Sequence, residues 1–296
     1  MLKLNVFKVR NPYDPTGREF TFSCPANDEF VAGWMKHGWI FEPFNLHVLG
    51  TMLKPGSVVL DVGAHIGTYA VVLGTTVSKC RIYSFEPQGP VYSVLLKNLE
   101  LNRVENCTPF NLGVAHRQLM TSMQRAVSDG TGAGRAVSYN NPRKYNFAGL
   151  SVGLGQHVVA CVSLDEFASK ALLKRIDLLK IDVEGAEPYV FYGSRAIIRK
   201  FRPIIHFEEN DKRVTSEMAR GLGTLEDGEE AHFIIRRYVR DMGYRYFRLP
   251  FDNVMLVPHE RTSRSVVELF DLMHSDSEYF DNMHVFRRDR YSPGSF

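Results

Sequence analysis

A glycine-rich turn preceded by an acidic residue carries the first chemical signal in the sequence. The segment Val58-Val-Leu-Asp-Val-Gly-Ala-His-Ile-Gly67 runs from a β-rich apolar stretch into this turn, with Asp61 two residues before the first glycine. Such a turn lets a nucleotide-like ligand approach the backbone, but its spacing differs from the G-x-G-x-x-G fingerprint that seats a pyrophosphate. Because Asp61 would repel a pyrophosphate and suits a positively charged ligand, the pattern favours S-adenosylmethionine. The same spacing makes an NAD-dependent oxidoreductase the least favoured interpretation.

A second acidic residue follows at a distance that suits nucleoside binding. Glu86 closes the next apolar run, 19 residues after Gly67. In doubly wound sheets a carboxylate in this neighbourhood accepts hydrogen bonds from both ribose hydroxyls. The turn and Glu86 together therefore predict a nucleoside-binding site.

Further acidic residues end two later apolar runs. Lys180-Ile-Asp-Val-Glu-Gly-Ala-Glu187 contains three carboxylates, and His206 and Glu208 end the next run with a spacing that puts both on one face of a strand. Transfer of a methyl group to a hydroxyl needs a base near the acceptor oxygen. Asp182 and His206 are the natural candidates for this base, and Glu208 completes the expected catalytic group.

The same carboxylates support two other interpretations. Asp182, Glu184 and Glu208 offer oxygen ligands for a divalent cation. Glu184 and Glu187 also suit the N-terminus of the following helix, whose dipole favours negative charge. We expect the helix-end role for at least one of these two glutamates, and metal dependence stays open.

An alternation of strands and helices must position these residues. From residue 57 to about 208, short β-rich apolar runs alternate with helical stretches, which indicates βαβ units and a parallel sheet. The expected strands cover residues 57–62, 81–86, 107–112, 157–162, 176–182 and 203–208, followed by a hairpin at 244–249 and 253–258. The expected helices cover residues 66–73, 91–101, 163–171, 188–200 and 232–242.

The domain organisation follows from where this pattern begins and ends. Residues 1–50 are expected to form an N-terminal extension packed on the core, residues 51–260 the α/β domain, and residues 261–296 a helical tail. A region rich in Gly, Asn and Ser interrupts the alternation from about 113 to 156. A loop this long in a compact domain is either functional or disordered.

Bulk composition narrows the class of protein and its surroundings. The chain is 44% hydrophobic and 23% charged, as in soluble globular proteins, and its formal net charge of +3 is too small for a nucleic-acid footprint. Four widely spaced cysteines favour a reducing compartment. No apolar run reaches the length of a membrane span, and the N-terminus lacks signal-peptide character. We therefore expect a cytoplasmic protein with no membrane partner.

Taken together, these segments resemble the FkbM family of methyltransferases. The resemblance covers roughly residues 28 to 208, and its most specific part is Lys-Ile-Asp-Val-Glu-Gly. It implies a Rossmann-like class I methyltransferase fold, α/β with a mostly parallel sheet and a C-terminal antiparallel hairpin. It also implies S-adenosyl-L-methionine as the donor and an oxygen acceptor, usually a hydroxyl of a sugar or secondary metabolite. The matching stretches are Asp28-Glu-Phe through Phe41-Glu-Pro43, Leu60 to Gly67, Phe85-Glu-Pro87, Asn98-Leu-Glu-Leu-Asn102, Ser163-Leu-Asp165, Ile176 to Glu187 and Pro203-Ile-Ile-His-Phe-Glu208.

The resemblance also implies roles by position. Glu86 would hold the ribose, Asp182 with Glu184 would face the acceptor, and the adenine-binding residue would lie between positions 111 and 129. The cofactor-binding residues implied are Asp61, Gly63, Ala64, His65, Gly67, Thr68, Glu86, Pro87, Asn111, Gly113 and Asp182, with Asp61 and the two glycines of the turn at the methionine end. There are departures: His65 stands where the family usually has Asn, Gln88-Gly89 differs from the commoner continuation, and the region 113–156 is longer than expected.

The acceptor is expected to be a glycan or a small hydroxylated metabolite, so the leading hypothesis is an O-methyltransferase. Trp34, His37 and Tyr145 would supply a platform and contacts for a sugar, or the tryptophans simply pack residues 30–45 onto the sheet. A nucleic-acid methyltransferase is disfavoured because the chain has no Asn-Pro-Pro-Tyr or Asp-Pro-Pro-Tyr segment. A non-catalytic module that binds S-adenosylmethionine would not need the polar cluster at Asp182 and His206. Homo-oligomerisation stays open.

Overall fold

A seven-stranded sheet forms the centre of the molecule. The computed structural model describes residues 3–26, 28–123, 157–183, 186–208, 239–250, 253–264 and 266–268. The strand order is β11-β12-β10-β9-β3-β4-β5. The five strands from β5 to β10 run parallel, whereas β12 is antiparallel to both β10 and β11. The expected parallel sheet with a C-terminal antiparallel hairpin is thus confirmed, with β3 (Val58–Val62), β4 (Arg81–Phe85), β5 (Cys107–Phe110), β9 (Leu178–Ile181), β10 (Ile204–Glu208), β11 (Tyr244–Arg248) and β12 (Asn253–Pro258).

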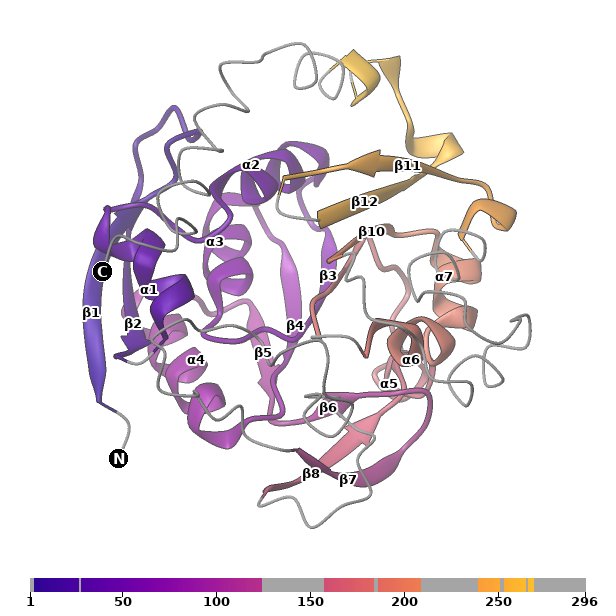
Figure 1. The fold of residues 1–296 in the computed structure, drawn as a ribbon. Coiled ribbons are helices and arrows are strands. Elements are labelled where there is room, and N and C mark those ends of the chain that lie inside the picture. The colour runs from indigo at the N-terminus through magenta and orange to yellow at the C-terminus, as the bar shows by residue number, and fades with distance from the viewer. Residues whose placement is uncertain are drawn as a thin grey trace, which may run out of the picture.

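Helices cover both faces of this sheet, as Figure 1 shows. Every residue of β3 and β9 is buried, which explains why both strands read as nearly continuous apolar runs. Alternate residues of each strand face two separate apolar clusters: Val59 and Leu178 join one, Leu60 and Leu179 the other. The first cluster includes α2 (Pro43–Met52), α3 (Thr68–Thr76) and α4 (Gly89–Leu101); the second includes α5 (Leu164–Lys170), α6 (Glu187–Tyr192) and α7 (Arg195–Phe201).

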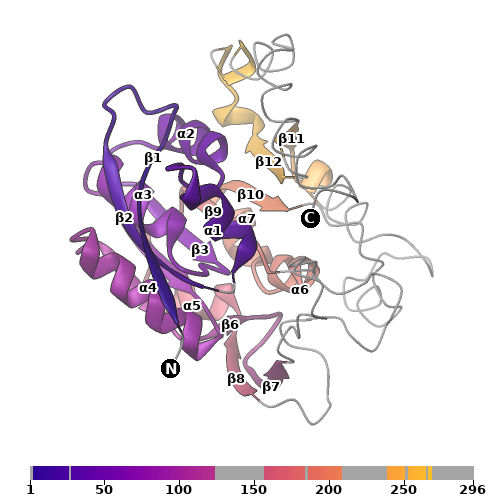
Figure 2. The ribbon, with the colours of Figure 1, turned by 60° about the vertical axis from the view of Figure 1, so that its left-hand side comes forward.

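The N-terminal residues share the first of these clusters. Strands β1 (Leu4–Arg10) and β2 (Glu19–Pro25) form an antiparallel pair, and α1 (Glu29–Lys36) follows. Figure 2 shows β2 running alongside α4. Val9, Phe20 and Phe22 are buried in the same cluster as α3. The hairpin therefore packs directly on the helix layer of the α/β core.

The region expected to be one long loop begins with two strands. β6 (Gly113–Val114) and β7 (Leu119–Met123) flank β8 (His157–Val162) in a separate three-stranded sheet of order β6-β8-β7. The strand expected at 157–162 therefore exists but lies outside the main sheet. Residues 124–156 are outside the described part of the chain, as is most of the helix expected at 232–242.

The single helix expected at 188–200 is wrong, because two helices occupy this stretch. Helix α6 ends at Tyr192 and α7 starts at Arg195. A Cβ on Gly193 would lie 2.2 Å from the carbonyl oxygen of Ala115, so the break lets the backbone pass close to the chain after β6. Asp165 accepts hydrogen bonds from the backbone N–H groups of Ala196 and Ile197 at 3.1 and 2.9 Å. These bonds satisfy backbone donors at the start of α7 that have no partner within the helix.

Two further features concern the surroundings of the protein. All four cysteines are free thiols. Among the described residues, no helix has both the length and the apolar character to cross a membrane.

Candidate active site

The turn after β3 has a backbone conformation that constrains its sequence. Gly63, His65 and Gly67 all have positive φ, at 73°, 51° and 88°. A Cβ on Gly63 would lie 1.7 Å from the carbonyl oxygen of Asp182, and one on Gly67 would lie 2.4 Å from Leu95 Cδ1. The two glycines are therefore required for both conformation and close packing. His65, where the family usually has Asn, occupies a left-handed conformation that Asn and His adopt more readily than most residues.

The end of β4 holds this turn through Glu86. The Glu86 Oε2 atom accepts a hydrogen bond from the His65 N–H at 3.0 Å, and its Oε1 atom accepts one from the Gln88 N–H at 2.8 Å. Burial raises the pKa of Glu86, which is only 3% exposed. Asn111 Nδ2 donates to the carbonyl oxygens of Glu86 and Pro87 at 2.8 and 3.1 Å. The predicted residues Glu86, Pro87 and Asn111 thus lie together beside the turn.

A row of polar residues crosses the sheet beneath the turn. Ser84, Asp61, Lys180 and His206 are successive register partners on β4, β3, β9 and β10. Because side chains alternate along a strand, all four lie on the face that α2 and α3 cover. Two residues further along each chain, on the same face, come Glu86, Gly63, Asp182 and Glu208. The sheet therefore brings the carboxylates expected from sequence together at one edge, the edge formed by the carboxyl ends of its parallel strands.

Lys180 connects three parts of this arrangement, and sequence reasoning did not select it. Its Nζ atom donates to the Gly63 carbonyl oxygen at 2.9 Å and lies 3.6 Å from Asp61 Oδ1 and 3.4 Å from Asp182 Oδ2. Burial opposes its charge, but Asp182, Asp61 and Glu42 together raise the pKa of Lys180. The sequence did contain a signal for this role, because Lys180 lies within the apolar strand Leu-Leu-Lys-Ile and lysine is almost never buried without partners.

Asp61 and His206 do not have the positions expected of a ligand contact and a base. Asp61 is 0% exposed and accepts a hydrogen bond from Ser84 Oγ at 3.2 Å, so it acts on the turn through Lys180. His206 is 1% exposed, its ring lies 5.6 Å from that of Tyr69, and neither ring nitrogen has a hydrogen-bond partner within the described residues. Burial and the neighbouring Lys180 charge lower the pKa of His206 to about 3. Burial within the strands, beneath α3, does not favour the roles predicted for these two residues, and both roles stay predictions.

Asp182 has the accessibility that a base requires. It follows the last residue of β9, and its side chain is 33% exposed. Glu208 ends β10, where it is half-buried and pairs in register with Asn253 of β12. Glu184, expected at the acceptor or a cation, lies outside the described residues. No group of three His, Cys, Asp or Glu side chains in the described ranges is arranged to hold a metal ion.

Glu42 is a further carboxylate at this edge that sequence reasoning missed. Its Oε2 atom accepts a hydrogen bond from Tyr69 Oη at 2.5 Å, and its Oε1 atom accepts one from Asn253 Nδ2 at 2.7 Å. Burial, reinforced by the Asp182 charge, raises the pKa of Glu42. Its backbone is left-handed with φ of 50°, and its side chain does not cap α2. The stretch Phe41-Glu-Pro43 belonged to the family resemblance, but only the fold brings it to β12.

The aromatic residues proposed as a sugar platform divide between core and surface. Trp34 is 4% exposed, and its ring packs against those of Trp39 and Phe41 with centroids 6.5 Å away in each case. Trp34 is therefore a packing residue, and the alternative that the tryptophans attach residues 30–45 to the core accounts for it. His37 is exposed at the C-terminal end of α1. Tyr145 lies outside the described residues.

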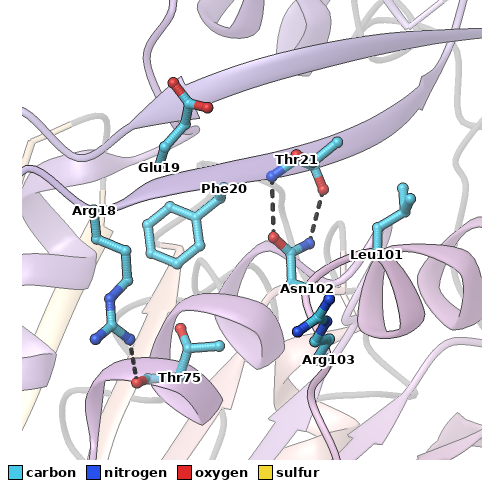
Figure 3. A pocket seen from close by; sticks show the side chains of 8 residues that line it. All are labelled: Arg18, Glu19, Phe20, Thr21, Thr75, Leu101, Asn102 and Arg103. Atoms are coloured by element: carbon cyan, nitrogen blue, oxygen red, sulfur yellow. Dashed lines mark hydrogen bonds between the residues drawn. The ribbon is translucent and has the colours of Figure 1, made fainter.

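A separate hollow lies away from these carboxylates. Figure 3 shows it between β2 and the C-terminal ends of α3 and α4. Its volume is about 260 Å³. Arg18 donates to the Thr75 carbonyl oxygen there, and Asn102 pairs with Thr21. It contains none of the site residues expected from sequence, so it is not the candidate active site.

The fold and this edge of the sheet define a class I methyltransferase: the strand order, the glycine turn after β3 and the carboxylate after β4 coincide. The family model described as the Methyltransferase FkbM domain matches residues 61–246, more than half of the chain. The chain belongs to the FkbM family of S-adenosylmethionine-dependent methyltransferases.

Three relatives are 24% to 29% identical to the chain over part of its length. The chain is 29% identical over 189 residues to "AMB antimetabolite synthetase AmbE" of Pseudomonas aeruginosa, covering 55% of this chain and 9% of that protein. It is 27% identical over 148 residues to "Methyltransferase 1" of Beauveria bassiana, covering 46% and 58%. It is 24% identical over 173 residues to "2-O-methyltransferase NoeI" of Sinorhizobium fredii, covering 56% and 69%. The chain thus spans less than two thirds of the first two relatives.

The solved structures that resemble this chain include an FkbM methyltransferase from Methylobacillus flagellatus KT. It is 16% identical, with a TM-score of 0.43, over 69% of this chain and 44% of that one.

Proposed function

We propose that this protein transfers a methyl group from S-adenosylmethionine to a hydroxyl of a glycan or a small hydroxylated metabolite. The observation that carries the proposal is the convergence of the Gly63–Gly67 turn, Glu86 and Asp182 at the carboxyl edge of the parallel strands, where open α/β sheets bind ligands. The name of the NoeI relative, a 2-O-methyltransferase, supports oxygen as the acceptor atom.

The residues present fit this cofactor by charge. Glu86, Asp182 and Glu42 are carboxylates, and the buried cation beside them, Lys180, is already engaged by Gly63 and two aspartates. Such a site suits a ligand with cationic groups and repels a pyrophosphate. Glu86 would hold the ribose hydroxyls, since each of its oxygens keeps a free lone pair beside one backbone donor. The Gly63–Gly67 turn would take the methionine end.

The residues of this chain then supply proton transfer and orientation. S-adenosylmethionine provides an activated methyl group on a sulfonium. A carboxylate oxygen of Asp182 accepts the proton of the acceptor hydroxyl, and Lys180, 3.4 Å away, keeps that carboxylate in place. His206 takes no part in this proton transfer because it is buried and because its lowered pKa makes it a weak proton acceptor.

The test combines a binding measurement with an acceptor screen. Labelled methyl transfer from S-adenosylmethionine is measured against glycans, nucleotides and hydroxylated metabolites, with calorimetry of cofactor binding alongside. Asp182→Asn is expected to keep binding the cofactor and to lose about 10²- to 10⁴-fold in turnover, the usual contribution of a general base. His206→Gln is the control and is expected to retain turnover.

Each outcome has a separate meaning. A fully active Asp182→Asn protein would remove Asp182 from the base role, and inactivation of His206→Gln with intact folding would return His206 to it. Methylation of nucleic acid alone would favour the second enzymatic class, and binding without any transfer would favour a non-catalytic module. Activity unaffected by a chelator would exclude an essential divalent cation.

A further inference from the structure

The side chains of Asn98 in α4 and of Asn102, the residue directly after α4, pair with β2 in the way a neighbouring strand would. Asn98 accepts from the Ser23 N–H at 2.7 Å and donates to the Ser23 carbonyl oxygen at 2.9 Å. Asn102 does the same with Thr21, at 3.0 and 2.7 Å. Four helical residues rise about 6 Å and two strand residues about 6.6 Å, so the Asn-x-x-x-Asn spacing matches alternate residues of the strand. The N-terminal hairpin is therefore attached to α4 through side-chain amides.

Only one of these two asparagines also reaches the glycine turn. Asn98 Nδ2 donates to the Ile66 carbonyl oxygen at 2.8 Å, and the residue is 0% exposed. The second donor contact of Asn102 goes instead to the Asn98 carbonyl oxygen, within its own helix. Asn98 thus joins β2, α4 and the turn at one point.

The turn needs such contacts because its conformation is costly. Left-handed backbone at a residue other than glycine persists when the surrounding structure determines it, and His65 lies immediately before Ile66. Asp28, in the segment between β2 and α1, places its Oδ2 atom 3.3 Å from His65 Nε2 and accepts from the Val31 N–H. Leu95 contacts the position of Gly67 from α4. The turn is therefore held at adjacent residues from α4 and from the N-terminal segment.

We propose that Asn98 is a positioning residue for the cofactor site, through which the β1–β2 hairpin keeps the Gly63–Gly67 turn in its binding conformation. The hairpin lies outside residues 61–246, the part that matches the family model. The proposal rests on the proposed function, because it takes the turn to bind S-adenosylmethionine. Since coupling between two sites is reciprocal, cofactor binding must in turn stabilise the contact between Asn98 and β2.

The first test compares matched variants by calorimetry with S-adenosylhomocysteine. Asn98→Ala and Asn102→Ala each remove one amide pair with β2 and are expected to lower the free energy of unfolding. Only Asn98→Ala removes the contact with Ile66, so it is expected to weaken binding roughly fivefold or more, and Asn102→Ala by less than about twofold. Equal effects of both variants on affinity, or none, would overturn the proposal. Failure of the unaltered protein to bind would instead count against the proposed function.

A second measurement needs no variant and so avoids any loss of folding. Hydrogen exchange is followed at the Ser23 and Thr21 amides, which donate to Asn98 and Asn102 respectively. Saturating S-adenosylhomocysteine is expected to slow exchange at Ser23 more than at Thr21, because only Ser23 shares its partner with the turn. Equal slowing at both amides in a protein that binds the ligand would show that Asn98 does not transmit the effect.

Discussion

At the scale of single residues, buried charges organise the site more than exposed ones do. Lys180 is 3% exposed yet contacts Asp61, Asp182 and the Gly63 carbonyl oxygen. Asp61, chosen from sequence as a ligand contact, is completely buried and holds Lys180. The acidic residue before the glycine turn thus acts on that turn indirectly, because it contacts the lysine that donates a hydrogen bond to Gly63.

This arrangement predicts the effect of removing the lysine charge. Lys180→Met is expected to lower the free energy of unfolding by about 3–5 kcal/mol, because it leaves Asp61 as a buried charge without its cation. Urea unfolding measures the change. The double variant Asp61→Asn, Lys180→Met removes both charges and is expected to recover much of the loss. A single variant as stable as the unaltered protein would show that the pair is not structurally important.

At the scale of elements, the turn and α4 form a closely packed unit. Gly67 begins α3 in a left-handed conformation, and Leu95 of α4 occupies the space that a side chain there would need. Asn98, three residues after Leu95, lies on the same side of α4 and contacts Ile66. The conformation of the turn is therefore a property of both elements together.

Substitutions at two glycines can separate packing from backbone conformation. Gly67→Ala should cost about 1–2 kcal/mol for its positive φ and a further ~1–3 kcal/mol for the contact with Leu95. Gly38→Ala is the matched control, since Gly38 has a φ of 76° and no atom lies within 4 Å of the position that its Cβ would take. It should cost only the conformational part. Both changes are measured by chemical unfolding, and equal losses would contradict the packing argument.

At the scale of the whole molecule, the parallel strands bring distant residues into register. Ser84, Asp61, Lys180 and His206 lie up to 145 positions apart along the chain (206 − 61) but side by side across four strands. Glu42 and Asn253, from opposite ends of the sequence, meet above this row. The resulting interior is polar and shielded from solvent, so the stability of the protein must depend on pH.

His206 makes that dependence testable. Its pKa falls from an ordinary 6.5 to about 3, so the unfolded chain takes up a proton that the folded protein does not. The contribution of the neutral His206 ring to the free energy of unfolding is fully present above pH 6.5. It is lost as the pH falls from 6.5 towards 3, by up to about 1.4 kcal/mol per pH unit. His206→Gln should therefore show a shallower decline in unfolding free energy between pH 7 and 5. Parallel declines would mean that His206 is not buried as a neutral ring.

The sequence by itself determined most elements of the α/β domain and the edge of the sheet at which the candidate site lies. Alternating apolar runs, the glycine spacing and carboxylates at strand ends are local patterns, and most predicted strands and helices follow them because they depend on nearby residues. The turn, Glu86 and Asp182 were identified in this way. Two features were not predicted from the sequence: the small sheet of β6, β7 and β8, and the break between α6 and α7. Both depend on packing between separate segments of the chain.

Only the tertiary structure decided which polar residues are accessible to solvent and which are buried. Asp61 and His206 are buried, and Tyr69 of α3 packs against His206. Asp182 and Glu208, each two residues nearer the carboxyl end of the sheet, are partly exposed. It also brought Glu42 and Asn98 to the site. Their partners lie on other elements, and contacts between residues far apart in the chain leave no periodic pattern in the sequence.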